Sequence, residues 1–192
     1  MVRQVTRWRA GAVLGGALLL ASCSSSPVLL DGADFTGLES TTQDDGGALA
    51  PGWTWCDDLR PGLYTGASVT SSFLTFDDDA RAGATIIDLS EDARSSDYVL
   101  EQYAAAAEGC AESDAASGGY TIDRITGLGN GETGWTTRRS DGEWGQYVLV
   151  RLDDVRVLAV GFSTTQDEAP VDLDDLVERA TAGAEQFAAS EG

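Results

Sequence analysis

The chain has 192 residues, and its 32 Asp and Glu outnumber its 12 Arg, which gives a formal net charge of −20 at pH 7. It contains no Lys and no His, so a Ser-His-Asp triad, a Cys-His pair and a His-ligated zinc site are all excluded. Such an acidic chain repels phosphate backbones, so we expect no nucleic-acid partner. The length of the chain predicts one domain with a single core.

The first residues carry Arg3, Arg7 and Arg9 without an acidic residue, and an apolar run follows at positions 10–20. The run is too short for a membrane span, which needs about 20 residues. A basic flank followed by a short apolar stretch is typical of a secretory signal. We therefore predict a leader over residues 1–22 that directs the rest of the chain out of the cytosol.

The predicted leader ends within Leu20-Ala21-Ser22-Cys23. These residues resemble a bacterial lipobox, where a signal peptidase cuts before a cysteine that carries diacylglycerol. The resemblance implies that Cys23 is lipidated and that acyl chains such as palmitate hold the protein on the extracytoplasmic face of the cell membrane, since two chains give stable anchoring. The alternative is an ordinary signal peptide with a cysteine at this position by chance.

Residues 23–50 are mainly Ser, Thr, Gly and Asp, without an apolar period of a strand or a helix. This composition predicts a flexible tether between the lipidated cysteine and a single folded domain over residues 51–192. Alternatively, the apolar residues Val28-Leu29-Leu30 and Phe35 form a docking segment for a partner.

Two cysteines remain once Cys23 is set aside, namely Cys56 and Cys110. An even pair in an exported protein indicates a disulfide, which we predict between these two residues. A reactive thiol is the alternative. It is disfavoured because neither cysteine lies in a C-x-x-C motif and because acidic surroundings oppose thiolate formation.

Two strands and a helix open the folded body. Enrichment in Val, Thr, Ile and Phe predicts strands at residues 68–76 and 84–89. A helix is predicted over residues 97–108, with Ser96 as its N-cap, and we expect Gly109 to end it in the left-handed conformation.

Four further strands are predicted at residues 120–125, 133–139, 143–152 and 155–162. Asp141-Gly142 and Asp153-Asp154 lie at two of the joins and indicate tight hairpin turns. Apolar side chains alternate along the last two strands, which predicts a sheet with one apolar face and one mixed face, half-covered by helices.

A second helix follows Pro170, with Asp172 as its N-cap. Its apolar residues recur at helical spacing and form one stripe: Leu173, Leu176, Val177, Ala180, Ala184 and Phe187. Together the elements predict an α+β fold, mainly an antiparallel sheet of about five to six strands with two helices packed on it, in the order β-β-α-β-β-β-β-α.

Several segments resemble a known domain family. They are Tyr98-Val99-Leu100-Glu101-Gln102-Tyr103 running into Gly109-Cys110, then Ile125-Thr126-Gly127-Leu128-Gly129-Asn130-Gly131, Val148-Leu149-Val150-Arg151 and Val157-Leu158-Ala159-Val160. They look like the extracellular sensor-type domain of some mycobacterial Ser/Thr kinases and of small actinobacterial lipoproteins. The resemblance implies a groove on the sheet for an unknown ligand and no established catalytic residues. Members of that family often carry two disulfides, whereas only one can form here.

Acidic runs are the first candidate site. Asp77-Asp78-Asp79, and Asp172 with Asp174 and Asp175, could offer oxygen ligands to Ca²⁺. The EF-hand pattern is absent, and a solvated turn and a capped helix explain the two sets, so we predict no metal site. With 32 acids, some carboxylate pair suited to glycoside hydrolysis arises by chance, and we expect neither an enzyme nor a cofactor.

The second candidate is an aromatic binding face. Four aromatic residues lie on predicted strands and two arginines lie near them: Tyr120, Trp135, Trp144 and Tyr147, with Arg138 and Arg151. Aromatic faces bind sugars, lipids or peptides, and the arginines would pair with an anionic ligand. The alternatives are that the aromatic residues belong to the core and that the arginines form salt bridges with nearby Asp.

The loop Gly127-Leu128-Gly129-Asn130-Gly131 is glycine-rich like a phosphate-binding loop. A strand and not a helix is predicted after it, so no helix N-terminus faces the glycines, and we predict a turn.

These observations predict a non-enzymatic, lipid-anchored binding or sensor-like domain that recognises a small envelope ligand or an envelope protein on its sheet face. The alternatives are a structural or adaptor lipoprotein in a membrane protein complex and, third, a hydrolase that uses paired carboxylates.

Overall fold

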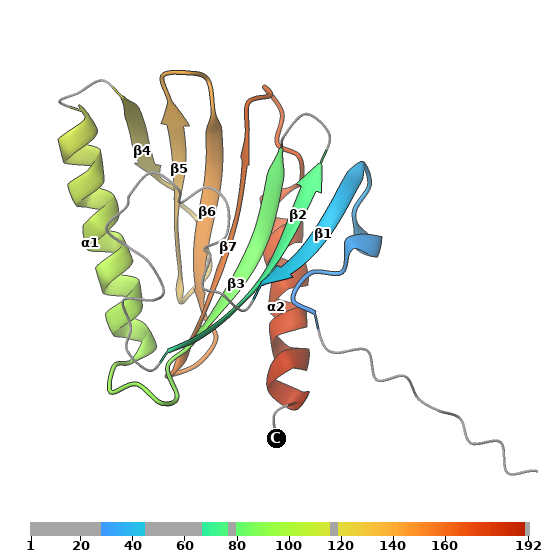
Figure 1. The fold of residues 1–192 in the computed structure, drawn as a ribbon. Coiled ribbons are helices and arrows are strands. Elements are labelled where there is room, and N and C mark those ends of the chain that lie inside the picture. The colour runs from blue at the N-terminus through green and yellow to red at the C-terminus, as the bar shows by residue number, and fades with distance from the viewer. Residues whose placement is uncertain (1–27, 45–66, 77–79, 116–118, 191–192) are drawn as a thin grey trace, which may run out of the picture.

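The computed structural model describes residues 28–44, 67–76, 80–115 and 119–190 of the chain. These residues form one seven-stranded antiparallel sheet, in the order β1-β2-β3-β7-β6-β5-β4, and two long helices (Figure 1). The elements are β1 (Leu38–Asp44), β2 (Ser68–Phe76), β3 (Arg81–Asp88), α1 (Ser96–Ala115), β4 (Tyr120–Arg124), β5 (Glu132–Arg139), β6 (Trp144–Arg151), β7 (Arg156–Thr164) and α2 (Leu173–Ser190). The predicted α+β class is therefore confirmed. No helix in the described part of the chain is long and apolar enough to cross a membrane.

All six predicted strands are present close to their predicted bounds, and the structure adds a seventh, β1, at the edge beside β2. The order along the chain is therefore β-β-β-α-β-β-β-β-α. Residues 39–43 of β1 are all exposed. Because neither face of this edge strand is covered, its polar sequence shows no alternation from which a strand could be predicted.

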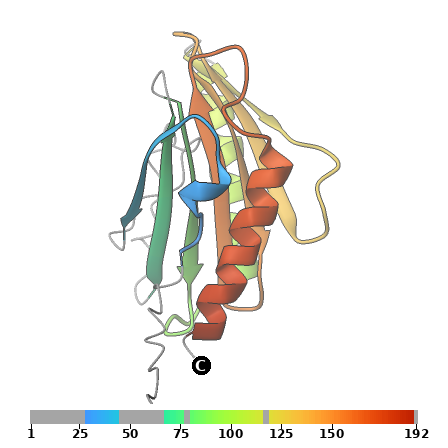
Figure 2. The same ribbon diagram turned by 90° about the vertical axis from the view of Figure 1, so that its right-hand side faces the viewer.

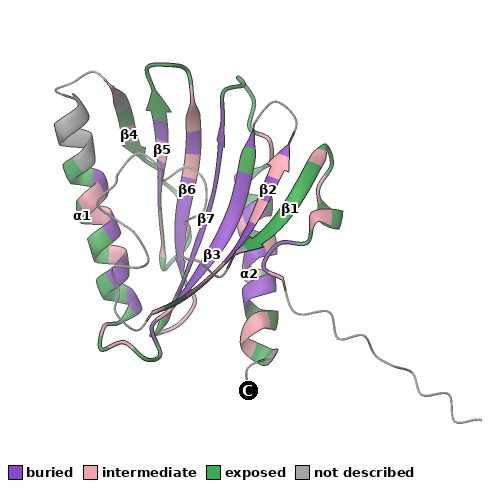
Figure 3. Cartoon of the chain, in the orientation of Figure 1, coloured by how far each residue is buried: buried purple, intermediate pink, exposed green. Residues whose placement is uncertain are grey.

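The two helices cover opposite faces of the sheet (Figure 1 and Figure 2). In β7, Leu158 and Val160 belong to the core beneath α2, whereas Val157 and Ala159 belong to the core beneath α1. We call these the α2-side core and the α1-side core. The central strands β3, β7 and β6 are thus buried on both faces (Figure 3). The prediction of one mixed face on a half-covered sheet is wrong, because each face supports a helix.

Helix α1 differs from its prediction at both ends. Its first turn is capped by Ser95 and not by Ser96, since the amide N–H of Tyr98 donates to Ser95 Oγ over 3.4 Å while Ser96 is fully buried. The helix also continues through Gly109 to Ala115. One glycine costs a helix about 1 kcal/mol, which does not end a helix that is held on the sheet by its buried face.

Helix α2 begins where the sequence predicts. The amide N–H of Asp175 donates to Oδ1 of Asp172 over 3.1 Å, which confirms Asp172 as the N-cap. Leu176, Ala180 and Ala184 are buried in the α2-side core, and the other stripe residues pack at its border. The predicted apolar stripe is confirmed.

Residues 28–37, which we call the N-terminal strap, lie beside α2 at the β1 edge of the sheet (Figure 2). Leu29 and Leu30 are 1% and 2% exposed in the α2-side core. Phe35 packs edge-to-face on Phe76, with ring centroids 6.5 Å apart. The predicted flexible tether is therefore wrong for residues 28–44, because this segment completes the core and adds a strand. The apolar residues weighed as a docking segment pack on the chain's own fold.

The strap and α2 meet backbone to backbone at Gly183. A Cβ on Gly183 would overlap the carbonyl oxygen of Leu29 and lie 2.9 Å from its Cα. Only a residue without a side chain allows this approach, so Gly183 fixes how closely the strap packs on the helix.

Replacing Leu176 by Asp should unfold the domain, because the carboxylate would be buried in the α2-side core without a partner. We expect a loss of more than about 3 kcal/mol from a typical total of about 5–15 kcal/mol. Circular dichroism and thermal melting would measure it. Ala182→Asp adds the same charge at an exposed position of the same helix and should stay folded. A folded, monomeric Leu176→Asp protein would contradict the packing of α2.

Gly183→Ala and Gly109→Ala should change stability in opposite directions, although both replace a helical glycine. Nothing lies within 4 Å of a Cβ placed on Gly109, so alanine there should stabilise by about 0.5–1 kcal/mol. At Gly183 the new Cβ must displace the strap, which should destabilise by about 1–3 kcal/mol. Denaturant melts would compare the two variants, and equal stabilisation would show that the strap does not press on α2.

Candidate functional site

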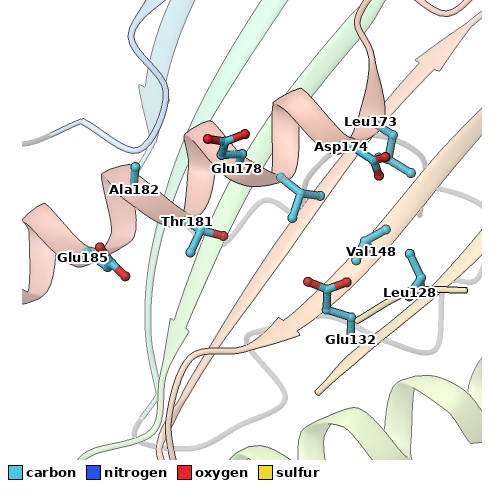
Figure 4. Close-up of a pocket in the computed structure, with 10 residues that line it drawn as sticks. Leu128, Glu132, Val148, Leu173, Asp174, Glu178, Thr181, Ala182 and Glu185 are labelled. Carbon is cyan, nitrogen blue, oxygen red and sulfur yellow. The ribbon is translucent and has the colours of Figure 1, made fainter. Parts of the chain in front are cut away.

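An open groove runs along α2 on the side of β5 and β6 (Figure 4). Its volume is about 430 Å³, which is in the range of small-molecule sites. Helix α2 forms one wall, and β6, the start of β5 and the loop between β4 and β5 form the rest. The groove is lined by Leu128, Glu132, Val148, Leu173, Asp174, Val177, Glu178, Thr181, Ala182 and Glu185.

The floor of the groove is apolar, and Leu128 reaches it because a glycine lies beneath. A Cβ added to Gly134 of β5 would lie 3.2 Å from Leu128 Cδ1 and 2.7 Å from the carbonyl oxygen of Tyr147. Leu128 packs at the border of the α2-side core together with Val177, while Val148 is fully part of it. Gly134 therefore allows a loop residue to form part of the floor.

The glycine-rich loop 127–131 is held in a fixed shape. Gly127 and Gly131 have φ values of 86° and 83°, which favour glycine. The amide N–H of Gly129 donates to Oε2 of Glu132 over 2.8 Å, and the amide N–H of Arg151 donates to the carbonyl oxygen of Gly131 over 2.9 Å. The predicted turn is confirmed. Glu132 thus accepts the hydrogen bond of a loop amide N–H, which in a phosphate-binding loop would be donated to the ligand.

Four carboxylates surround the apolar floor. Glu132 lies on the sheet side, and Asp174, Glu178 and Glu185 lie along α2 (Figure 4). Within the described residues, none of the four forms an ion pair. The groove thus combines an apolar floor with an uncompensated negative rim.

A second hollow, of about 500 Å³, lies on the other side of α2 against the strap. Arg179 forms ion pairs there with Asp175 at 2.8 Å and Asp34 at 3.4 Å, and its guanidinium lies 5.5 Å from the ring centroid of Phe35. The hydrogen bond to Asp175 raises the pKa of Arg179, against a smaller effect of desolvation. Arg179 already pairs with two of the four carboxylates that line this hollow, so the hollow is the weaker candidate for a binding site.

Two of the predicted aromatic site residues belong to the core. Trp135 and Tyr147 are 4% and 0% exposed in the α1-side core, and they are partners across β5 and β6. Tyr147 also stacks on Tyr103 of α1, with ring centroids 6.5 Å apart. For Tyr120 the structure describes only the backbone, in β4. Helix α1 therefore closes the face on which Trp135 and Tyr147 lie.

Trp144 lies on the opposite face, so the structure does not bring the aromatic residues together. Its ring meets Phe162 edge-to-face at 5.2 Å, and its Nε1–H donates to the carbonyl oxygen of Gln166 over 2.6 Å. Arg138 lies over the same ring, 5.1 Å from its centroid. Neither Trp144 nor Arg138 lines the groove.

Arg151 forms salt bridges, as the alternative interpretation held. It pairs with Asp154 at 2.6 Å and with Asp97 at 3.5 Å. In the same turn, desolvation raises the pKa of Asp153, but hydrogen bonds from the side chain and backbone of Arg156 lower it, and the net shift is downward. These ion pairs stabilise the hairpin turn between β6 and β7 and lie away from the groove.

Several predicted sites lie outside the described residues, namely Cys23, Cys56 and the acidic run 77–79. Cys110 lies in α1, but its side chain is not described, so lipidation and the disulfide stay predictions. In the part of the chain that the structure describes, no three His, Cys, Asp or Glu side chains gather as metal ligands. Of the second acidic set, Asp172 caps α2, and Asp174 lines the groove.

Sequence reasoning did not identify the groove, because its residues come from separate elements. Two signals were available. Leu128 is a lone apolar residue in a glycine-rich loop, and Asp174 and Glu178 have the like-charge spacing of four residues that costs helix stability. Neither signal indicates by itself that the loop and the helix face one another.

Comparisons with known proteins give one structural similarity. No protein-family model and no curated protein matches the chain. The extracellular domain of PknH from Mycobacterium tuberculosis has a similar structure, with a TM-score of 0.41 and 9% sequence identity, over 78% of this chain and 84% of that chain. This similarity is one of backbone arrangement, and it assigns neither a ligand nor an activity to the chain.

Proposed function

We propose that the chain is a non-enzymatic binding domain, held by a lipid on Cys23 at the extracytoplasmic face of the cell membrane, that takes up a ligand in the groove along α2. The groove itself carries the proposal. Ligand sites combine an apolar floor with a few polar groups, and Leu128, Leu173 and Val177 provide partly exposed apolar surface inside a ring of carboxylates. The proposed ligand therefore meets the α2 face of the sheet, whereas α1 packs on the opposite face over Trp135 and Tyr147.

The geometry of the carboxylates supports binding rather than catalysis. Asp174, Glu178 and Glu185 are exposed on α2, whereas a general acid or base with a shifted pKa needs a desolvated position. The chain has no His to serve as a base. We accordingly assign the carboxylates to recognition of a ligand.

A structural or adaptor role in a membrane complex is the second candidate, and the edge strand β1 favours it. Residues 39–43 are exposed, and the outer edge of β1 pairs with no other strand in the described sheet. Such an edge can receive a strand from a partner protein. Crosslinking in intact cells that yields one stoichiometric partner through β1 would favour this role over ligand binding.

The lipid anchor predicts a defined mature terminus. Mass spectrometry of the native protein should find Cys23 as the first residue with diacylglycerol attached, and Cys23→Ala should abolish the modification and leave the leader uncut. An unmodified terminus upstream of residue 23, or release of the native protein into the medium, would contradict the anchor.

Filling the groove should abolish ligand binding without unfolding the domain. Thr181 lines the groove on α2, and Thr181→Phe would occupy the space above the floor. A thermal-shift screen of envelope lipids, glycans and charged amphiphiles should find compounds that stabilise the native protein but not this variant. Ala105→Phe places the same ring on the exposed side of α1 and should bind normally. No stabilising compound, or equal binding by Thr181→Phe, would contradict the groove as the site.

A further inference from the structure

We infer that the ligand of the groove is a small cationic amphiphile, a molecule with an ammonium or guanidinium group on an apolar body. The inference rests on the proposed function, because it names the chemistry of the ligand for the same groove. Its basis is an apolar floor beside four carboxylates that no described residue neutralises.

The two sides of α2 show the contrast on which the inference depends. On the strap side, Asp175 and Arg179 are four residues apart and form an ion pair of 2.8 Å. On the groove side, Asp174 and Glu178 have the same spacing but carry like charges, and Glu178 also lines the hollow on the strap side. A like-charge pair at this spacing destabilises a helix, whereas an opposite-charge pair stabilises it. A cation bound in the groove would reduce the electrostatic repulsion between Asp174 and Glu178.

Most of the arginines in the described part of the chain are engaged elsewhere. Five of those that the structure describes form ion pairs with acidic residues outside the groove, and Arg138 packs over the ring of Trp144. No described arginine lines the groove, and the chain has no Lys or His. An anionic ligand would therefore meet carboxylates without a countercharge, whereas a cation would meet groups of opposite charge.

The floor requires that this cation also carry an apolar body. Leu128, Leu173 and Val177 are partly exposed around the buried Val148, and a hydrated metal ion would leave this surface uncovered. The described residues also hold no cluster of three metal ligands. A volume of about 430 Å³ suits a molecule of small size. An alkyl chain on the floor with its ammonium at the carboxylate rim uses both features of the groove.

Titration with three decyl compounds of equal length tests the inference. Decylammonium, decanol and decanoate, each below its micelle concentration, are titrated calorimetrically into the leaderless chain of residues 24–192, which contains every described element. Decylammonium should bind at least about tenfold more tightly than decanol, as a few charge-assisted contacts allow, and decanoate should not bind. Raising the ionic strength from about 0.01 to about 0.15 M shortens the Debye length from about 30 to about 8 Å and should weaken only decylammonium.

Glu→Gln variants keep the shape of the side chain but remove its charge, so they test whether the rim carboxylates cause the tighter binding of decylammonium. Glu132→Gln combined with Glu185→Gln removes one carboxylate from each wall at residues that do not line the strap-side hollow, and should weaken decylammonium about three- to thirtyfold while leaving decanol unchanged. The matched control is Glu101→Gln with Glu108→Gln, which removes two exposed carboxylates from α1 on the opposite face and should leave all affinities within about twofold. Circular dichroism would confirm that both double variants are folded.

The outcomes separate this inference from the proposed function. Equal affinity for decylammonium and decanol, or tight binding of decanoate, would overturn the cationic ligand and leave the groove as a binding site. Binding of a basic amphipathic peptide but of no decyl compound would overturn a small ligand in favour of a protein partner. If Thr181→Phe and the wild type bind decylammonium equally, the groove is not the site, and both the inference and the proposed function fail.

Discussion

The close packing of α2 between the sheet and the N-terminal strap is the constraint on which the rest of the structure depends. Small residues make it possible: Ala180 and Ala184 are buried against the sheet, and Gly183 meets the backbone of Leu29. Because interiors are close-packed, the helix cannot move toward either neighbour. The spaces on its two sides therefore have fixed widths. A hollow that contains Arg179 and its two ion pairs lies on one side, and the groove with its apolar floor lies on the other.

The elements that can be predicted from the sequence are those with at least one face packed against another part of the fold. Helix α2 has a clear stripe and cap, and the central strands are rich in β-branched residues, so their existence and type follow from local pattern. The end of α1 does not follow, because packing of Val99 and Tyr103 on the sheet outweighs the local preference of Gly109. Strand β1 and the strap do not follow either, because residues 39–43 of β1 are exposed and the strap adds only Leu29, Leu30 and the half-buried Phe35 to a core formed elsewhere.

The strap changes what a lipid on Cys23 would do. Only four residues separate Cys23 from Val28, where the described fold begins, and an extended chain spans at most about 3.6 Å per residue. A lipidated cysteine would therefore hold Val28, where the strap begins, within about 18 Å of the bilayer surface, instead of letting the domain turn freely at the end of a long tether. A domain held this close to the bilayer would meet amphiphiles that partition into the membrane more often than those dissolved in the periplasm or medium.

The two faces of the sheet differ because β5 places residues of opposite size on them. Trp135 faces α1, where it packs in one buried cluster with Tyr147 and Tyr103. The preceding residue, Gly134, faces α2 and contributes no side chain to the layer between sheet and helix. Leu128 fills part of the resulting gap from the loop above, and the groove is the part that remains. A ligand with an apolar body would complete this layer, and this is why we place the proposed binding surface on the glycine side of β5 and not on the aromatic side that the sequence favoured.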